Sequence, residues 1–177
     1  MDGEKWKKDG EAHYQTGAYA EALEAFANAR TAYDEAGDQA GAAEMLNNQG
    51  VVYRVMRQWK KAEAAFLEAR GAFAHLGDAD RQAQATANLA VLASSRGQTE
   101  QAISYFEEAI AAFQANGDGV RESDTWRALS RIFLRQGRWL DAVAAYGSAL
   151  NCLPRLSLGQ RLLRWLFRIP LRLLGGG

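Results

Sequence analysis

The feature that most constrains the fold of this chain is an internal repeat with a period of 40 residues. In each repeat an alanine is followed four positions later by an aromatic residue and three positions after that by a second alanine. Positions separated by four and seven residues share one face of an α-helix. The repeat therefore predicts helices whose small residues let a neighbouring helix approach closely, beside a space filled by an aromatic ring. The recurring residues are Ala22, Ala62, Ala102 and Ala142; Phe26, Phe66, Phe106 and Tyr146; and Ala29, Ala69, Ala109 and Ala149.

Two kinds of break divide each repeat into a pair of helices. A Gly-Asp pair begins at Gly37, Gly77 and Gly117, where the glycine suits a left-handed helix end and the aspartate can cap the next helix. A second break falls inside each unit, at Gly17, Arg57, Gly97 and Gly137. We expect first helices over residues 3–16, 40–56, 80–96 and 120–136. We expect second helices over residues 19–36, 59–76, 99–116 and 139–153.

The composition of the chain favours an all-α fold in a reducing compartment. Only two of the 177 residues are proline, and the apolar residues that dominate, alanine and leucine, are strong helix formers. A single cysteine, Cys152, excludes an internal disulfide. The first residues show no signal-peptide pattern, and no apolar run is long enough to span a bilayer. We expect a cytoplasmic protein, with peripheral attachment to the cytoplasmic face of a membrane left open.

The repeat resembles the tetratricopeptide repeat family, whose pattern is W-x2-L-G-x2-Y, then A-x3-F, then A and P. With the alanines in register, the tryptophan and glycine positions of the pattern fall on Trp6, Leu46, Thr86 and Trp126, and on Gly10, Gly50, Ala90 and Ser130. The match covers residues 3–154, and its long units with Gly-Asp turns resemble the subclass found in kinesin light chain. The resemblance implies a right-handed superhelical solenoid of four helix pairs. Its units would span about residues 1–37, 38–77, 78–117 and 118–154.

The resemblance also implies a concave groove, lined by the first helices, that receives an extended peptide or a helix. In the family an asparagine in this groove commonly binds the backbone of the partner, because an amide both donates and accepts hydrogen bonds. This position holds Asn48 and Asn88, which are the best candidates for partner binding. The alternative is that they are solvated surface residues. Other inward positions hold Lys7, Asn47, Glu11, Val51, Val91, Tyr14 and Arg54.

The fourth unit makes one end of the expected groove basic. Arg127, Arg131 and Arg135 are spaced four residues apart and share one helical face. Such a surface suits an acidic or carboxylate-bearing ligand. Alternatively, these arginines pair with neighbouring acids on a solvated face, namely Glu122, Asp124 or Asp141.

The residues after Pro154 have a different charge pattern. All 21 acidic residues lie at or before Asp141, whereas residues 155–177 contain five arginines and no acid. The arginines and the apolar residues fall on opposite sides of a helical wheel, which predicts a basic amphipathic C-terminal helix. It could lie in an anionic membrane interface, cap the last repeat or dock on another subunit. The residues proposed for membrane or partner contact are Arg161, Arg164, Trp165, Leu166, Phe167, Arg168, Ile169 and Arg172.

No pattern of catalytic or metal-binding residues accompanies the repeat. His13 and His75 are far apart in the register, Cys152 has no histidine near it, and no phosphate-binding glycine loop follows a strand. We therefore expect no enzymatic activity, no metal and no cofactor, and the zero net charge argues against nucleic acid as a ligand.

The predicted function is that of an interaction scaffold or adaptor. It would bind a partner peptide or helix in the groove and be tethered by its tail to a membrane surface or a larger complex. The alternative is a structural subunit that uses its convex or end surfaces. The tail would then cap the solenoid or occupy the groove until a partner displaces it.

Overall fold

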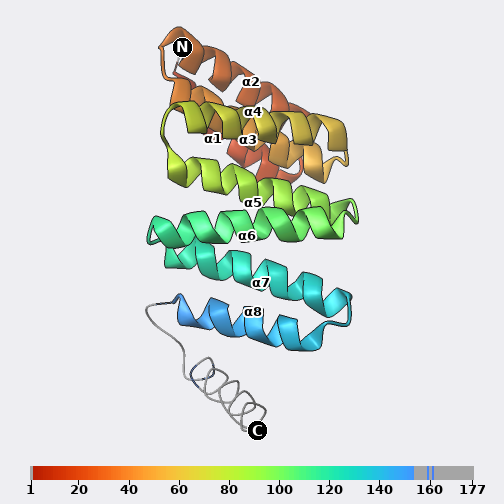
Figure 1. The fold of residues 1–177 in the computed structure, drawn as a ribbon. Helices are drawn as coiled ribbons and strands as arrows, with labels where there is room; N and C mark the ends of the chain where they lie inside the picture. The colour runs from red at the N-terminus through yellow and green to blue at the C-terminus, as the bar shows by residue number, and fades with distance from the viewer. Residues whose placement is uncertain (1, 154–158, 160, 162–177) are drawn as a thin grey trace, which may run out of the picture. The chain divides into compact units, whose positions relative to one another are not determined.

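The computed structural model describes residues 2–153, 159 and 161, and this part of the chain is built from helices with no strand (Figure 1). The predicted all-α repeat fold is therefore confirmed for the described residues. The remaining C-terminal residues, on which the predicted amphipathic helix falls, lie outside the described part. The described helices are α1 (Gly3–Thr16), α2 (Tyr19–Glu35), α3 (Gln39–Val55), α4 (Trp59–His75), α5 (Ala79–Ser95), α6 (Thr99–Ala115), α7 (Gly119–Arg135) and α8 (Trp139–Asn151).

The helices belong to two compact units. The first, Met1–Gln98, contains α1 to α5, and the second, Thr99–Gly177, contains α6 to α8. Within each unit every helix packs against the next one along the chain. In the first unit α3 also contacts α5, so that first helices of successive repeats lie next to each other. This arrangement brings the positions expected to face a partner onto neighbouring helices.

The turns between helices form as their residues predict. Gly37, Gly77 and Gly117 have φ angles of 74°, 69° and 72°, the left-handed conformation that glycine adopts without a steric penalty. The aspartate after each glycine accepts a hydrogen bond from a backbone N–H at the start of the next helix, with Asp38 Oδ1 lying 2.9 Å from the nitrogen of Gly41. Each of the eight helices begins and ends within two residues of its predicted bounds.

In the first unit, the contact between each pair of helices depends on a glycine that faces an aromatic ring. A Cβ atom added to Gly10 of α1 would lie 2.7 Å from the ring of Phe26 in α2. Gly50 of α3 has the same relation to Phe66 of α4, at 2.6 Å. Both rings are buried, so the missing side chain is what lets the two helices approach.

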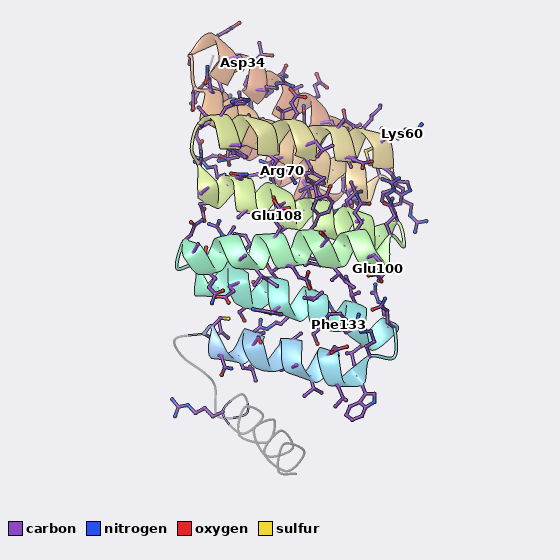
Figure 2. All side chains as sticks on the ribbon, viewed as in Figure 1. Asp34, Lys60, Arg70, Glu100, Glu108 and Phe133 are labelled. Carbon is purple, nitrogen blue, oxygen red and sulfur yellow. The ribbon has the colours of Figure 1, made fainter. Side chains whose placement is uncertain are left out.

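In the second unit, the repeat position equivalent to Gly10 and Gly50 holds a serine, Ser130 of α7. Ser130 is buried, and its hydroxyl donates a hydrogen bond of 2.8 Å to the carbonyl oxygen of Ala142 in α8. Ser123, seven residues or about two turns earlier on α7, donates in the same way to the carbonyl oxygen of Ala149 at 2.7 Å. Leu129 and Phe133, the second of which is labelled in Figure 2, are also buried on α7. Buried hydroxyls are tolerated here because each one has an acceptor.

We predict that Gly50→Ala destabilises the protein by about 1–3 kcal/mol, because the added methyl group would overlap the Phe66 ring in a close-packed core. The matched control is Gly71→Ala in α4, where an added Cβ meets no atom within 4 Å. That variant should gain up to about 1 kcal/mol from the better helix propensity of alanine. Urea unfolding followed by circular dichroism measures both. Equal stability of Gly50→Ala and the wild type would show that glycine is not required for the helix contact.

Candidate functional site

A hollow of about 250 Å³ opens between α1 and α3 in the first unit. Its walls carry both polar and apolar side chains, and the ring of Phe26 from α2 contributes to its lining. The remaining lining residues are Glu11, Tyr14, Gln15, Asn48, Val51 and Val52. Of these, the sequence register places Glu11, Tyr14, Asn48 and Val51 at inward positions. Gln15 was missed in the first repeat, although its equivalent in the fourth repeat, Arg135, is among the predicted groove residues.

Asn48 is the polar side chain on the α3 wall of this hollow. It is half-buried and forms no hydrogen bond within the described part of the chain. Val51, one turn further along α3, is half-buried beside it. An unoccupied amide next to an apolar side chain can bind a peptide backbone while the ligand's own side chain enters the hollow.

Asn47 and Asn88 have a different environment from Asn48. Asn88 Nδ2 on α5 donates a hydrogen bond of 2.9 Å to Asn47 Oδ1 on α3. Asn47 is only 5% exposed, so its side chain joins two helices and does not reach the surface as its register position suggests. Asn88 is half-buried, and this bond fixes the orientation of its amide. The two asparagines that share one repeat position thus differ, because Asn88 has a partner one helix away.

Two further candidates of the first unit, Arg54 and Val91, are half-buried on α3 and α5. Within the described residues Arg54 forms no hydrogen bond or ion pair, so its guanidinium remains available to a ligand. The first unit therefore offers one amide, one guanidinium and several apolar side chains from its first helices.

An ion pair joins α1 to α3 on the same side of the first unit. Lys7 Nζ lies 2.5 Å from Glu44 Oε1. Burial opposes the charged form of Lys7, but the hydrogen bond and charge of Glu44, with the nearby charges of Glu4 and Glu11, leave its pKa raised above the ordinary value. Lys7 is therefore engaged within the unit and holds α1 and α3 together.

Of the three arginines spaced four residues apart along α7, only one is paired with an acid among the described residues. Arg127 Nη1 lies 3.0 Å from Asp124 Oδ1, so the ion-pair alternative holds for this residue. Arg131 and Arg135 are exposed and have no hydrogen bond or ion pair among the described residues. Asp141 pairs instead with Arg138, at 2.7 Å.

The candidates in the tail are almost all outside the described part. Arg161 is described, is exposed and has helical backbone. The others, Arg164, Trp165, Leu166, Phe167, Arg168, Ile169 and Arg172, lie among the residues that the structure does not describe.

Cys152, the one nucleophilic thiol of the chain, has an environment that suppresses its reactivity. Burial, assisted by the neighbouring Glu122 carboxylate, raises the pKa of the Cys152 thiol to about 12. Its Sγ donates a hydrogen bond to the carbonyl oxygen of Ser148 at 3.1 Å. Because the thiolate is the nucleophilic form, this thiol is poorly suited to catalysis near neutral pH.

No group of three or more His, Cys, Asp or Glu side chains in the described part is arranged to hold a metal ion. Among the described helices, none combines the length and the apolar character needed to cross a bilayer.

Comparison with known proteins assigns the family. The sequence model named Tetratricopeptide repeat matches residues 41–115 and 81–155, which together make up more than half of the chain. The chain therefore belongs to the tetratricopeptide repeat family, as the repeat register predicts. Comparison with curated proteins gives no match.

Several solved structures share the fold at low sequence identity. BtubC (BKLC) from P. vanneervenii is 24% identical, with a TM-score of 0.72 over 86% of this chain and 66% of BtubC. Aspartyl phosphate phosphatase F from Bacillus subtilis is 17% identical, with a TM-score of 0.80 over 85% of this chain and 39% of that protein. The Rap conjugation gene regulator of plasmid pLS20, solved with the Phr* peptide, is 22% identical, with a TM-score of 0.76 over 84% and 41%. The chain thus spans less than two thirds of each structure, and the likeness establishes the helical-repeat fold.

We predict that Asn88→Ala lowers the free energy of unfolding by about 1–3 kcal/mol, because it leaves the buried Asn47 oxygen without its donor. The matched control is Asn48→Ala, which removes no hydrogen bond of the described structure and should change stability by no more than about 0.5 kcal/mol. Urea denaturation of both variants checks this. An equal loss in both would contradict the different environments of the two asparagines.

Proposed function

We propose that this protein is a non-enzymatic interaction scaffold or adaptor, which binds a partner peptide or helix along the first helices of its first unit. The observation that carries the proposal is the hollow between α1 and α3, with the unoccupied amide of Asn48 on its wall and Val51 beside it. The binding surface is Asn48, Val51, Arg54, Asn88 and Val91, named here the groove set.

The size of the hollow favours a side chain of a longer ligand over a small molecule. Small-molecule sites usually enclose about 300–1,000 Å³ and bury most of the ligand. The hollow holds about 250 Å³ and is open between two helices. It therefore suits one apolar side chain of a segment whose backbone passes over Asn48. Tyr14 on α1 and Val51 on α3 supply the apolar walls.

Charge on the groove set favours an acidic group in the partner. Arg54 is half-buried, and a hydrogen bond from its guanidinium to a carboxylate is charge-assisted and therefore stronger than one between neutral groups. The exposed Arg131 and Arg135 of the second unit provide the same chemistry on α7. The presence of the Phr* peptide in the structure of the pLS20 Rap regulator supports a peptide as the class of partner.

A structural role through a different surface of the first unit is the second candidate. A hollow of about 290 Å³ lies between α2, α3 and α4, with Leu46, Ala72 and Leu76 among its lining residues. An ion pair of 2.9 Å between Arg30 and Glu68 borders it. A subunit of an assembly could dock there and leave the groove set empty.

The experiment that separates the two candidates is selection of peptides from a random display library on the full chain. We predict that the selected peptides bind at least about tenfold more weakly to Asn48→Ala/Val51→Asp than to the wild type, because the amide and the apolar wall are lost together. Leu76→Asp in the other hollow is the matched control and should bind normally. Loss of binding in Leu76→Asp alone would support the structural role and contradict groove binding.

We propose further that the basic C-terminal tail attaches this scaffold to a membrane surface or a larger complex, on the cytoplasmic side. The support is compositional: residues 155–177 contain five arginines, no acid and a high share of leucine, with Trp165 and Phe167 among them. Basic amphipathic segments of this kind bind interfaces that carry anionic lipid. The competing role for the same segment is to cap the end of the last repeat.

We predict that the full chain co-sediments with phosphatidylcholine vesicles that contain phosphatidylserine, and much less with pure phosphatidylcholine vesicles. The variant Arg161→Gln/Arg164→Gln/Arg168→Gln should lose most of this binding, because each arginine near an anionic surface contributes about 1 kcal/mol. The control is Arg30→Gln/Arg81→Gln in the first unit, which lowers the net charge without touching the tail. Wild-type protein that stays in the supernatant at low salt would rule out a lipid tether.

A further inference from the structure

The turn between α7 and α8 exposes three large apolar side chains close together in the chain. Leu134 is 59% exposed, Trp139 is 64% exposed and Leu140 is 56% exposed. The turn has the same backbone form as the others: Gly137 has a φ angle of 74°, and the backbone N–H of Arg138 donates a 2.9 Å hydrogen bond to the carbonyl oxygen of Phe133. We call Leu134, Arg135, Trp139 and Leu140 the turn patch.

The repeat itself shows that two of these side chains belong together. In the first unit the positions equivalent to Leu134 and Trp139 are Tyr14 and Tyr19, whose ring centroids lie 6.0 Å apart. Those two tyrosines are half-buried, whereas Leu134 and Trp139 are exposed. The fourth repeat therefore has Leu134 and Trp139 at two positions whose equivalents in the first repeat contact each other. Both side chains are nevertheless exposed to solvent.

Leu140 is unusual for its repeat position. The equivalent residues are Ala20, Lys60 and Glu100, and all three are exposed. This position thus faces solvent in every repeat, and only the fourth fills it with a large apolar residue. Burial in the core does not explain a leucine there, and with Leu134 and Trp139 it forms a group of exposed apolar side chains, the kind of feature that marks an interaction surface.

Basic residues outnumber acidic ones around the turn patch, although Glu100 Oε1 lies 3.4 Å from Gln136 Nε2 at the turn and Asp141 follows Leu140. From Arg131 to Leu140 the chain contains three arginines and no acid. Arg138 is neutralised by Asp141 at 2.7 Å, and its guanidinium carbon lies 4.4 Å from the centre of the Phe133 ring. Arg135 has no partner among the described residues and is exposed. In the sequence, the five arginines of residues 155–177 follow the fourth repeat.

We propose that the turn patch is a second lipid-binding site, which docks the α7–α8 turn onto an anionic membrane surface. Trp139 and Leu140 would enter the interface between headgroups and acyl chains, where tryptophan is favoured, and Arg135 would bind the lipid phosphates and carboxylates. This proposal rests on the tail tether proposed above and adds a contact that fixes how the protein is held. One weak anchor gives reversible binding, and a second anchor on the same chain makes it stable.

Other occupants of the turn patch explain the observations less well. A second copy of the chain would bring Arg135 of both copies to one interface, and like charges oppose such a contact. An acidic protein segment satisfies the charge, but it needs a complementary surface for three protruding side chains. A lipid interface adapts to them and engages the tail at the same time.

The test uses the full chain in a Cys152→Ser background, so that one introduced thiol can carry an environment-sensitive dye. The dye is placed at Leu140→Cys in the turn patch and, as a matched control, at Leu67→Cys in α4, where the leucine is 44% exposed. Phosphatidylcholine vesicles with phosphatidylserine should shift the emission of the dye at position 140 to the blue and leave the dye at position 67 unchanged. In parallel, Trp139→Ser/Leu140→Ser should co-sediment about tenfold more weakly than wild type, because two apolar side chains no longer enter the interface. Both changes lie at exposed positions, and unchanged far-UV circular dichroism would confirm that the fold is retained.

The outcomes separate this proposal from the tail tether. If vesicle binding depends on Arg161, Arg164 and Arg168 but the dye at 140 does not respond and Trp139→Ser/Leu140→Ser binds normally, the turn patch is not a lipid site and the tether stands. If neither the wild type nor any variant binds vesicles, both proposals fail. If a polyglutamate peptide shifts the dye at position 140 as strongly as the vesicles do, the patch is a site for acidic protein and the lipid proposal is wrong.

Discussion

The contact between a small residue on one helix and an aromatic ring on the next is the interaction on which the first unit depends. Gly10 faces Phe26, and Gly50 faces Phe66, at distances that leave no room for a methyl group. Dispersion contacts are individually weak, but a buried ring gains many of them when a helix backbone lies directly against it. Glycine inside a helix lowers the stability of that helix, and the close packing against the ring compensates for this loss.

This packing also determines which residues are free to bind a partner. Once the glycine of a first helix faces inward, Asn48 and Val51 of α3 have to lie on another face, where the hollow beside α1 opens. The ion pair between Lys7 and Glu44 and the hydrogen bond between Asn88 and Asn47 connect these first helices to each other. The proposed groove set is therefore held by the same helices that form the core, which would reduce the conformational entropy lost on binding a ligand there.

The second unit shows how one repeat can acquire a surface that the others lack. Its small position is Ser130, whose hydroxyl is bonded to α8, so the helix pair keeps its spacing without glycine. At the α7–α8 turn the repeat positions remain, but Leu134, Trp139 and Leu140 make them apolar and exposed. A repeat fold permits this because each unit needs only its packing positions, and surface positions are free to vary.

The sequence by itself determined the helices, their turns and the family. The Gly-Asp pairs act through local backbone conformation, and the repeated alanines and aromatic residues act through positions four or seven apart on one helix. Both signals can therefore be recognised from the sequence alone. Tertiary structure alone decided which of the predicted inward residues are available. Asn48 and Asn88 share one repeat position and Asn47 holds the inward position next to it, yet Asn47 is buried and bonded to Asn88 while Asn48 remains open. Arg127 likewise has a partner within its own helix that Arg131 lacks. Such differences depend on which side chain of a neighbouring helix comes within hydrogen-bond distance, and the spacing of one helix cannot specify this.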